Sequence, residues 1–496
     1  MRRAPAARGN VRARWRRGLA CALLVLATAA AGAAERTNFV FLMADDQGWG
    51  ETGYNGHPHL RTPVLDEMAR SGLRLDRFYA ASSVCSPTRA SVLTGRHANR
   101  SGAFAPNWST RPEEITIGHI LQRAGYRTGH FGKWHVGPVK RESPLNPSRM
   151  GFDAYVSHDN FFEMDPPLSR DGAPPEIMPG ESSAVIVAEA VAFIRRAQAE
   201  GRPFFVLVHF GSPHDPYSGR PEDIALYRHL PEPISRRFAE ITALDRAIGT
   251  LRQALRELGV RDQTLVWYNS DNGITWEGIP EAQRADLYNG PWRGKKGEIY
   301  EGGFLVPGLV EWPSVIRAPR VSSVRAVTSD FLPTVLDLVG LAYPAPERPL
   351  DGISLKPLLL GATTERPQPI GFWRYPVQGE SGHERWISAE LSRGTTPTTR
   401  NPAIAFQNFR HPVPKTRDFG GEAAWTDQRY KLVVGEARRA KTGPRVELYD
   451  LLADPAETTD VAARFPDVVR RMKGELETWQ RSVERSLSGA DYPARR

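Results

Sequence analysis

Apolar and polar positions are grouped in blocks along this chain. Three short apolar runs, Asn38–Ala44, 204–210 and Thr264–Ser270, each end in polar residues, which is typical of strands buried on both faces. Apolar residues then recur every three or four positions from Phe238 to Leu258, which predicts a long amphipathic helix with one buried face. Strands that alternate with helices favour an α/β fold with a large, mostly parallel central sheet flanked by helices.

The same patterns predict further elements in the first two thirds of the chain. Thr62 and Pro63 suit the start of a helix, and Gly72 suits its end. The run 304–312 predicts another apolar strand, and 330–341 predicts a helix. We expect ligands to collect beyond the carboxyl ends of the parallel strands, as they do in other open α/β sheets.

A proline-rich stretch at 366–369 predicts a domain boundary, because proline interrupts regular structure. Beyond it, 429–434 and 445–451 read as antiparallel strands and 466–483 as a final helix, so we expect a smaller C-terminal α+β subdomain built on an antiparallel sheet. The stretch 392–419 is rich in Thr, Pro and Arg without periodicity, which predicts a surface loop. The predicted domains are 35–365, catalytic, and 366–496, the C-terminal subdomain.

The first 34 residues read as a removable signal peptide. Arg2 to Arg17 form a positive segment, Leu19 to Ala30 an apolar one, and Ala31-Gly32-Ala33 resembles a cleavage site. The apolar run is too short for a stable membrane span. We therefore expect an exported protein, periplasmic or secreted, that depends on the export machinery.

The net charge of +9 does not indicate a nucleic-acid-binding protein. Seven arginines and no acidic residue lie in the predicted leader, so the remaining chain has only a small positive excess. Cys21 also lies in the leader, which leaves Cys85 without a disulfide partner. A lone cysteine of this kind is usually a small buried apolar residue.

Two predicted strands end in carboxylates. Asp45 and Asp46 follow one strand, and Asp271 and Asn272 follow another. A turn or a helix cap is the ordinary role of such residues. Three carboxylates and an amide at one edge would repel each other without a hard cation, however, and oxygen ligands favour calcium or magnesium over zinc. The sequence therefore predicts a calcium or magnesium site here.

The neighbours of Cys85 indicate a special environment. Pro87 and Thr88 suit a helix start and Gly95 suits its end, so Cys85 would lie where free backbone N–H groups favour an anion. Cys85, Pro87 and Arg89 form a C-x-P-x-R pattern, followed by Thr94-Gly95-Arg96. This pattern resembles the signature of the sulfatases, formylglycine-dependent enzymes of the alkaline phosphatase superfamily.

The resemblance extends to four further blocks in the family's order. They are Asp45-Asp46, Gly132-Lys133-Trp134-His135, Ser212-Pro213-His214, and Asp271-Asn272 with the Lys295-Lys296-Gly297 segment before Glu301-Gly302-Gly303. The resemblance implies that Cys85 is oxidised to formylglycine by a maturating enzyme and that, with Asp45, Asp46, Asp271 and Asn272, it ligates one metal ion, Ca²⁺ with Mg²⁺ as the alternative.

Further roles are implied for the basic residues. Lys133 and Lys296 would bind sulfate, with Lys295 a weaker alternative, and Arg89 would complete the cationic cluster. His135 would act as a base, and His214 would protonate the leaving oxygen. Lys133 and His135 are two residues apart, so on an extended segment both would face one side. The ordinary alternatives are a surface lysine, a satisfied histidine and a turn.

The resemblance implies hydrolysis of a sulfate ester, of a sulfated carbohydrate or an aryl sulfate, through the formylglycine hydrate. Two alternatives remain at this point. One is a phosphatase or phosphodiesterase of the same superfamily, and the other is a catalytically inactive, sulfatase-derived glycan-binding protein. Asn107-Trp108-Ser109 matches a glycosylation pattern, which we interpret as chance.

Overall fold

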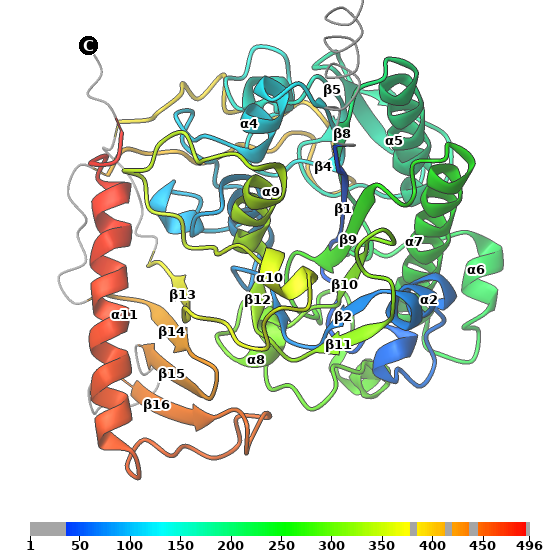
Figure 1. Cartoon of the computed structure of the whole chain (residues 1–496). Coiled ribbons are helices and arrows are strands. Elements are labelled where there is room, and N and C mark those ends of the chain that lie inside the picture. Colours follow the sequence, from blue (N-terminus) through cyan, green and yellow to red (C-terminus); the bar gives the residue numbers. More distant parts are fainter. Residues whose placement is uncertain (1–35, 377–383, 412–418, 436–444, 493–496) are drawn as a thin grey trace, which may run out of the picture. The chain divides into compact units, whose positions relative to one another are not determined.

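The computed structural model describes residues 36–376, 384–411, 419–435 and 445–492. Its largest element is a ten-stranded sheet (Figure 1). The strands, in order across the sheet, are β11 (Arg320–Ser322), β2 (Leu73–Leu75), β10 (Gly308–Glu311), β9 (Thr264–Ser270), β1 (Asn38–Ala44), β8 (Phe204–His209), β4 (Arg127–Lys133), β5 (Ala154–His158), β6 (Pro167–Arg170) and β7 (Glu176–Ile177).

The centre of this sheet is parallel and buried. Strands β9, β1, β8, β4 and β5 run in one direction, whereas β10, β6 and β7 introduce antiparallel pairs towards the edges. Every residue of β1 and β9 is buried, which explains their continuous apolar sequences. The carboxyl ends of the central strands therefore meet at one rim of the sheet.

Helices cover both faces of the sheet (Figure 1). The helices α2 (Pro63–Ser71), α5 (Ser182–Ala199) and α7 (Glu232–Glu257) bury apolar side chains on one face. The opposite face packs against α3 (Cys85–Thr94), α4 (Ile117–Arg123) and α9 (Phe331–Val339). The shorter α6 (Pro221–Ala225), α8 (Glu301–Phe304) and α10 (Lys356–Leu359) and the strand pair β3 (Phe78–Tyr79) and β12 (Ala326–Val327) complete the large part.

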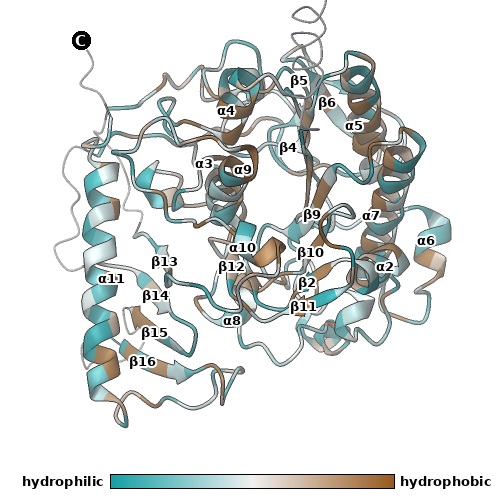
Figure 2. Ribbon diagram, in the orientation of Figure 1, coloured by the Kyte–Doolittle hydropathy of each residue, from teal (hydrophilic) through white to brown (hydrophobic). Residues whose placement is uncertain are grey.

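The C-terminal part contains a separate antiparallel sheet. Its four strands are β13 (Ile370–Arg374), β14 (Glu422–Thr426), β15 (Tyr430–Gly435) and β16 (Arg445–Asp450). The long helix α11 (Pro466–Leu487) packs on this sheet through Met472, Leu476 and Val483, and its remaining surface is largely hydrophilic (Figure 2). The predicted fold class is thus confirmed. The domain boundary near residue 366 stays a prediction.

Three predicted element boundaries are wrong. Helix α3 begins at Cys85 itself, two residues before the predicted Pro87 start. The predicted strand 304–312 is reduced to β10, because Glu301-Gly302-Gly303-Phe304 form the helical turn α8. The segment from Lys133 to His135 is not extended, since β4 ends at Lys133 and His135 has a φ of 58°.

The predicted surface loop 392–419 is described at 392–411 and at Phe419, and it is irregular as predicted but only partly exposed. Arg393 and Arg400 are exposed, whereas Ser392, Thr396 and Phe406 are buried. The carboxylate of Asp159, itself buried, accepts hydrogen bonds from the backbone N–H of Thr395 and from both the N–H and the hydroxyl of Thr396. The polar composition therefore predicted the irregular backbone but not the buried positions, because some of these polar groups pair with a buried acid.

The predicted leader, 1–34, lies outside the described residues, and so does Cys21. Within the described ranges, no helix is both long enough and apolar enough to cross a membrane.

Candidate active site and metal centre

The rim at the carboxyl ends of the central strands holds the predicted acidic residues. Asp45 and Asp46 directly follow β1, and Asp271 and Asn272 directly follow β9. Because β1 and β9 are paired in parallel from Asn38 to Ala44, their ends lie side by side. The order of strands in the sheet therefore brings together residues that are more than 200 positions apart in the sequence.

These side chains are fully buried and in contact. The amide Nδ2 of Asn272 donates to Oδ1 of Asp46 at 2.7 Å, and the backbone N–H of Asp46 donates to Oδ1 of Asp271 at 3.1 Å. Burial and the negative charge of Asp45 raise the pKa of Asp271 to about 6. Like-charged acids at this spacing are unfavourable without a cation.

Cys85 is the first residue of α3 and is buried against this cluster. Its sulfur and one carboxylate oxygen each of Asp45, Asp46 and Asp271 all lie within 4.8 Å of one another. The free N–H groups at a helix start favour negative charge at this position. Burial raises the pKa of the Cys85 thiol well above its ordinary value, so the unmodified thiol stays protonated.

Arg89 holds the acidic cluster from one turn further along α3. Its Nε and one terminal nitrogen donate to Oδ2 of Asp271, at 3.1 and 2.6 Å, and another terminal nitrogen donates to the backbone oxygen of Lys133. The guanidinium is completely buried. Arg89 thus ties Asp271 to the end of β4 by charge-assisted hydrogen bonds.

The ammonium groups of two lysines reach the acidic cluster, Lys133 from the end of β4 and Lys296 from the segment before α8. Nζ of Lys133 lies 2.6 Å from Oδ2 of Asp45, and Nζ of Lys296 lies 2.8 Å from Oδ2 of Asp46. Burial raises the pKa of Asp46, but the positive charges of Lys296 and Lys133 outweigh it and hold the pKa well below its usual range. Lys295 instead pairs with Glu298 at 3.7 Å, so Lys296 is the lysine that reaches the cluster.

His135 has one nitrogen paired and one free. Its Nε2 lies 2.8 Å from Oδ1 of Asn107, an acceptor, so Nε2 carries the proton. The buried Nδ1 has no hydrogen-bond partner among the described residues. Burial and the nearby Lys133 charge lower the pKa of His135 well below its usual value, which keeps the ring neutral.

His214 approaches the cluster from the loop after β8. Its Nδ1 lies 2.6 Å from the backbone oxygen of Asp215, which places a proton on Nδ1, and its Nε2 lies 3.7 Å from Oδ2 of Asp46. The ring of Phe161 stacks on the imidazole, with centroids 4.3 Å apart. Burial lowers the pKa of His214 to about 3. Nε2 is thus the ring nitrogen that faces the acidic cluster and is free to take part in proton transfer.

The donor set fits a hard divalent cation. Oδ1 of Asp45 and Oδ1 of Asn272 are buried and have no hydrogen-bond partner in the described structure. Such unpaired buried oxygens are costly unless something else binds them. Oxygen atoms of Asp45, Asp46, Asp271 and Asn272 match calcium or magnesium rather than zinc.

Several residues around the site were not found from the sequence. Asn107 was interpreted as a chance glycosylation pattern, yet its side chain pairs with His135. Glu277 contacts Lys296 at 3.2 Å, and Phe161 covers His214. Arg237 donates to the backbone oxygens of Asp46 and Pro213 and pairs with Glu51. A charge beside the apolar stripe that begins at Phe238 could have marked Arg237.

Comparison with known proteins supports the geometry. Residues 37–341 match the family model described as Sulfatase. Arylsulfatase A of Homo sapiens is 34% identical over 471 residues, which cover 82% of this chain and 88% of that protein. N-acetylgalactosamine-6-sulfatase of Canis lupus familiaris is 34% identical over 383 residues, covering 70% of this chain and 71% of that protein.

A solved structure shares the fold. Ps i-CgsB in complex with k-i-k-neocarrahexaose is similar with a TM-score of 0.73 and 23% identity, over 91% of this chain and 94% of that one.

The fold is an α/β fold with a mostly parallel central sheet, and a buried acidic cluster lies at the carboxyl ends of its central strands. The chain belongs to the sulfatase family and is a sulfuric ester hydrolase. This membership favours sulfate esters over the phosphatase alternative.

Proposed function

We propose that this protein is an exported sulfatase that uses formylglycine, made from Cys85, and one divalent ion, calcium or magnesium. The observation that carries the proposal is the position of Cys85 at the start of α3, within 4.8 Å of three buried carboxylates. Asp45, Asp46, Asp271, Asn272 and the modified Cys85 would hold the ion.

In this proposal the site needs two groups that the unmodified chain does not contain, formylglycine and a divalent ion. Formylglycine supplies a hydroxyl nucleophile, and the divalent ion supplies positive charge for the oxygens of the sulfuryl group. The chain's own cations bind and orient the ester. Lys133 and Lys296 reach the carboxylates from either side and would exchange these partners for sulfate oxygens, while Arg89 keeps Asp271 in place.

The two histidines divide the proton transfers in this proposal. His214 has its Nδ1 proton fixed on the Asp215 carbonyl, so it would protonate the departing alcohol oxygen from Nε2 only after Nε2 has taken up a second proton and the ring is an imidazolium. His135 has its Nε2 proton fixed on Asn107, so its unpartnered Nδ1 would accept a proton as sulfate is released. Each hydrogen bond selects one nitrogen for chemistry.

The substrate class that we propose is a sulfated carbohydrate, with aryl sulfates as small surrogates. The support is the printed names of its relatives, which include an N-acetylgalactosamine-6-sulfatase, and the oligosaccharide bound to a structural neighbour. Export would follow from the predicted signal peptide at 1–34 and would place the enzyme in the periplasm or outside the cell.

Turnover of a small aryl sulfate tests this function. Sulfate release by Cys85→Ala should fall by about 10⁴-fold or more, because the nucleophile is lost. Lys295→Ala is the matched control and should keep its activity, since Lys295 pairs with Glu298 rather than with the acidic cluster. Full activity in Cys85→Ala would refute the proposed nucleophile.

A further inference from the structure

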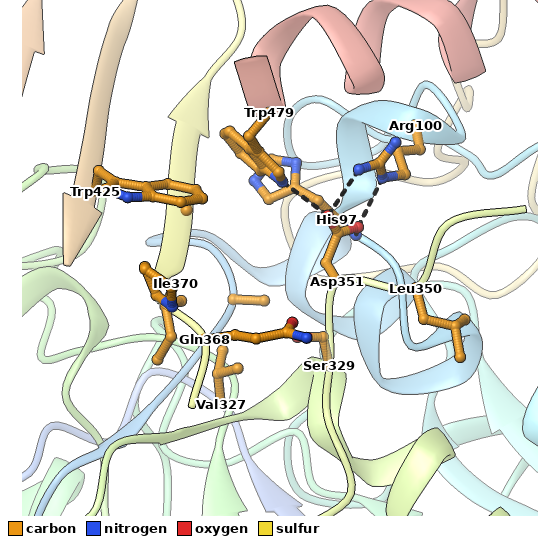
Figure 3. Close-up of a pocket in the computed structure, with 13 residues that line it drawn as sticks. His97, Arg100, Val327, Ser329, Leu350, Asp351, Gln368, Ile370, Trp425 and Trp479 are labelled. Atoms are coloured by element: carbon orange, nitrogen blue, oxygen red, sulfur yellow. Dashed lines mark hydrogen bonds and ion pairs between the residues drawn. The ribbon is translucent and has the colours of Figure 1, made fainter. Parts of the chain in front are cut away.

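A cavity of about 290 Å³ lies between the small sheet and the large part of the protein (Figure 3), and none of the acidic rim residues line it. It is lined by Trp425 of β14, Trp479 of α11, Ile370 of β13 and His97, which follows α3. Sites for small ligands are about 300–1,000 Å³ in size and occur preferentially where domains meet. This cavity is therefore just below that range.

The indole N–H groups of Trp425 and Trp479 already donate hydrogen bonds within the protein. Nε1 of Trp479 donates to Oδ1 of Asp351 at 2.8 Å, and Nε1 of Trp425 donates to Oε2 of Glu475 at 2.9 Å. Their rings have centroids 5.8 Å apart. What they contribute to the cavity is therefore apolar aromatic surface, which packs well against the CH groups of a pyranose ring.

The two tryptophans approach each other over a residue without a side chain. A Cβ added at Gly371 would lie 2.9 Å from atoms of both rings. In the view of Figure 3, Trp425 and Trp479 lie on one side of the space and Gln368, Ser329 and Val327 on the other. Gln368 is exposed, so its amide is available to hydroxyl groups.

A second cavity of about 380 Å³ adjoins the first, because Gln368 and Pro369 line both. Its lining contains four arginines, Arg325, Arg366, Arg429 and Arg471. We call the two cavities together the seam groove. The aromatic lining of the first cavity thus continues directly into the arginine-rich lining of the second.

Two of these arginines are half-exposed. Arg429 pairs with Asp450 at 2.7 Å, and Arg471 pairs with Asp427 at 3.0 Å and with Glu475 at 3.1 Å; the side-chain exposures of the two arginines are 54% and 48%. A guanidinium has five N–H donors, and these carboxylates take only some of them. Planar guanidinium groups match the oxygens of sulfate.

The other two arginines are buried. Arg366 is neutralised by Asp330, which it binds through two nitrogens. Arg325 is 3% exposed, and its Nε has no hydrogen-bond partner among the described residues, so it carries a positive charge with unused donor capacity.

We propose that the seam groove binds a segment of a sulfated glycan chain, with one sugar ring against Trp425 and Trp479 and its sulfate groups against Arg325, Arg429 and Arg471. The substrate class rests on the proposed function, but the groove is a separate site. Helix α3 carries Cys85 at its first residue and leads to His97 beyond its last turn, and ten helical residues span about 15 Å. The groove would hold a polymer while the rim acts on another of its esters.

Binding of a defined chain tests the proposal. The triple variant Gln368→Ala/Arg429→Gln/Arg471→Gln would be compared with the parent by calorimetric titration of chondroitin sulfate, both on the Cys85→Ala background to prevent hydrolysis. We expect binding about tenfold weaker, because two charge-assisted contacts are lost. All three residues are exposed, so the fold should tolerate the changes.

Arg470→Gln/Arg481→Gln is the matched control. Both residues lie on α11, outside the groove, with side-chain exposures of 76% and 62%, so this variant should bind chondroitin sulfate like the parent. Unsulfated chondroitin should bind weakly to all proteins.

Small-substrate turnover separates this proposal from the proposed function. With Cys85 present, the triple variant should hydrolyse a small aryl sulfate at the parent rate. Equal chondroitin sulfate binding by the triple variant and the control would overturn the groove proposal without affecting the sulfatase assignment. Absence of aryl sulfate turnover in the parent would instead count against the proposed function.

Discussion

Asp45 at the rim and Asp330 at the start of α9 are both completely buried carboxylates, but their surroundings differ. Asp330 accepts four hydrogen bonds, two from Arg366 and one each from the backbone N–H groups of Val327 and Ile353. Asp45 has Lys133 on one oxygen, while its other oxygen lies 3.7 Å from the Arg89 guanidinium and has no hydrogen-bond partner among the described residues. A buried carboxylate whose oxygens are all hydrogen-bonded supports the fold, whereas one with an oxygen that lacks a hydrogen-bond partner marks a ligand site.

The largest effect is expected at the rim. Asp45→Asn removes a proposed metal ligand and the charged partner of Lys133, so sulfate release should fall by about 10³-fold or more. Adding Ca²⁺ after chelator treatment should raise the melting temperature of the parent, since a ligand that binds the folded state stabilises it. This shift should shrink in Asp45→Asn. An equal shift in both proteins would place the cation elsewhere.

At Asp330, whose oxygens are all hydrogen-bonded, we expect a smaller effect, on stability rather than on activity. Asp330→Ala leaves the buried Arg366 without its partner, which should lower the free energy of unfolding by about 3–5 kcal/mol. The protein that remains folded should keep the Ca²⁺-dependent shift and its aryl sulfate turnover. Denaturant unfolding measures the first quantity. Loss of turnover in fully folded Asp330→Ala would break the distinction between the two carboxylates.

The smallest effect is expected at Asn107. Asn107→Ala removes the acceptor that fixes the Nε2 proton of His135, so the turnover number should fall by about tenfold, with little change in KM. Asn107→Asp keeps an acceptor at this position and should recover part of the rate. An unchanged pH–rate profile and turnover number in Asn107→Ala would exclude this positioning role.

The sequence predicted the rim because its residues follow strands that can be recognised locally. The apolar runs that precede Asp45 and Asp271 are continuous, and a parallel sheet brings the ends of such runs to one edge. The Glu-Gly-Gly segment likewise identified Lys296, and the ammonium does reach Asp46. Local patterns were sufficient wherever the backbone direction decides the position of a side chain.

The residues that the sequence did not reveal depend on contacts between distant segments. Asn107 reaches His135, and Thr396 satisfies Asp159, through irregular backbone that has no periodicity. The left-handed conformation of His135 was likewise not predictable from its spacing to Lys133. Tertiary packing decides these positions, so they became visible only in the folded structure.

Mass spectrometry of the tryptic peptide 78–89, from protein made in its native host, tests the central claim most directly. The account predicts that the Cys85 thiol is replaced by an aldehyde, with the corresponding loss of sulfur. A peptide that carries only unmodified Cys85, from enzyme that actively releases sulfate, would contradict it.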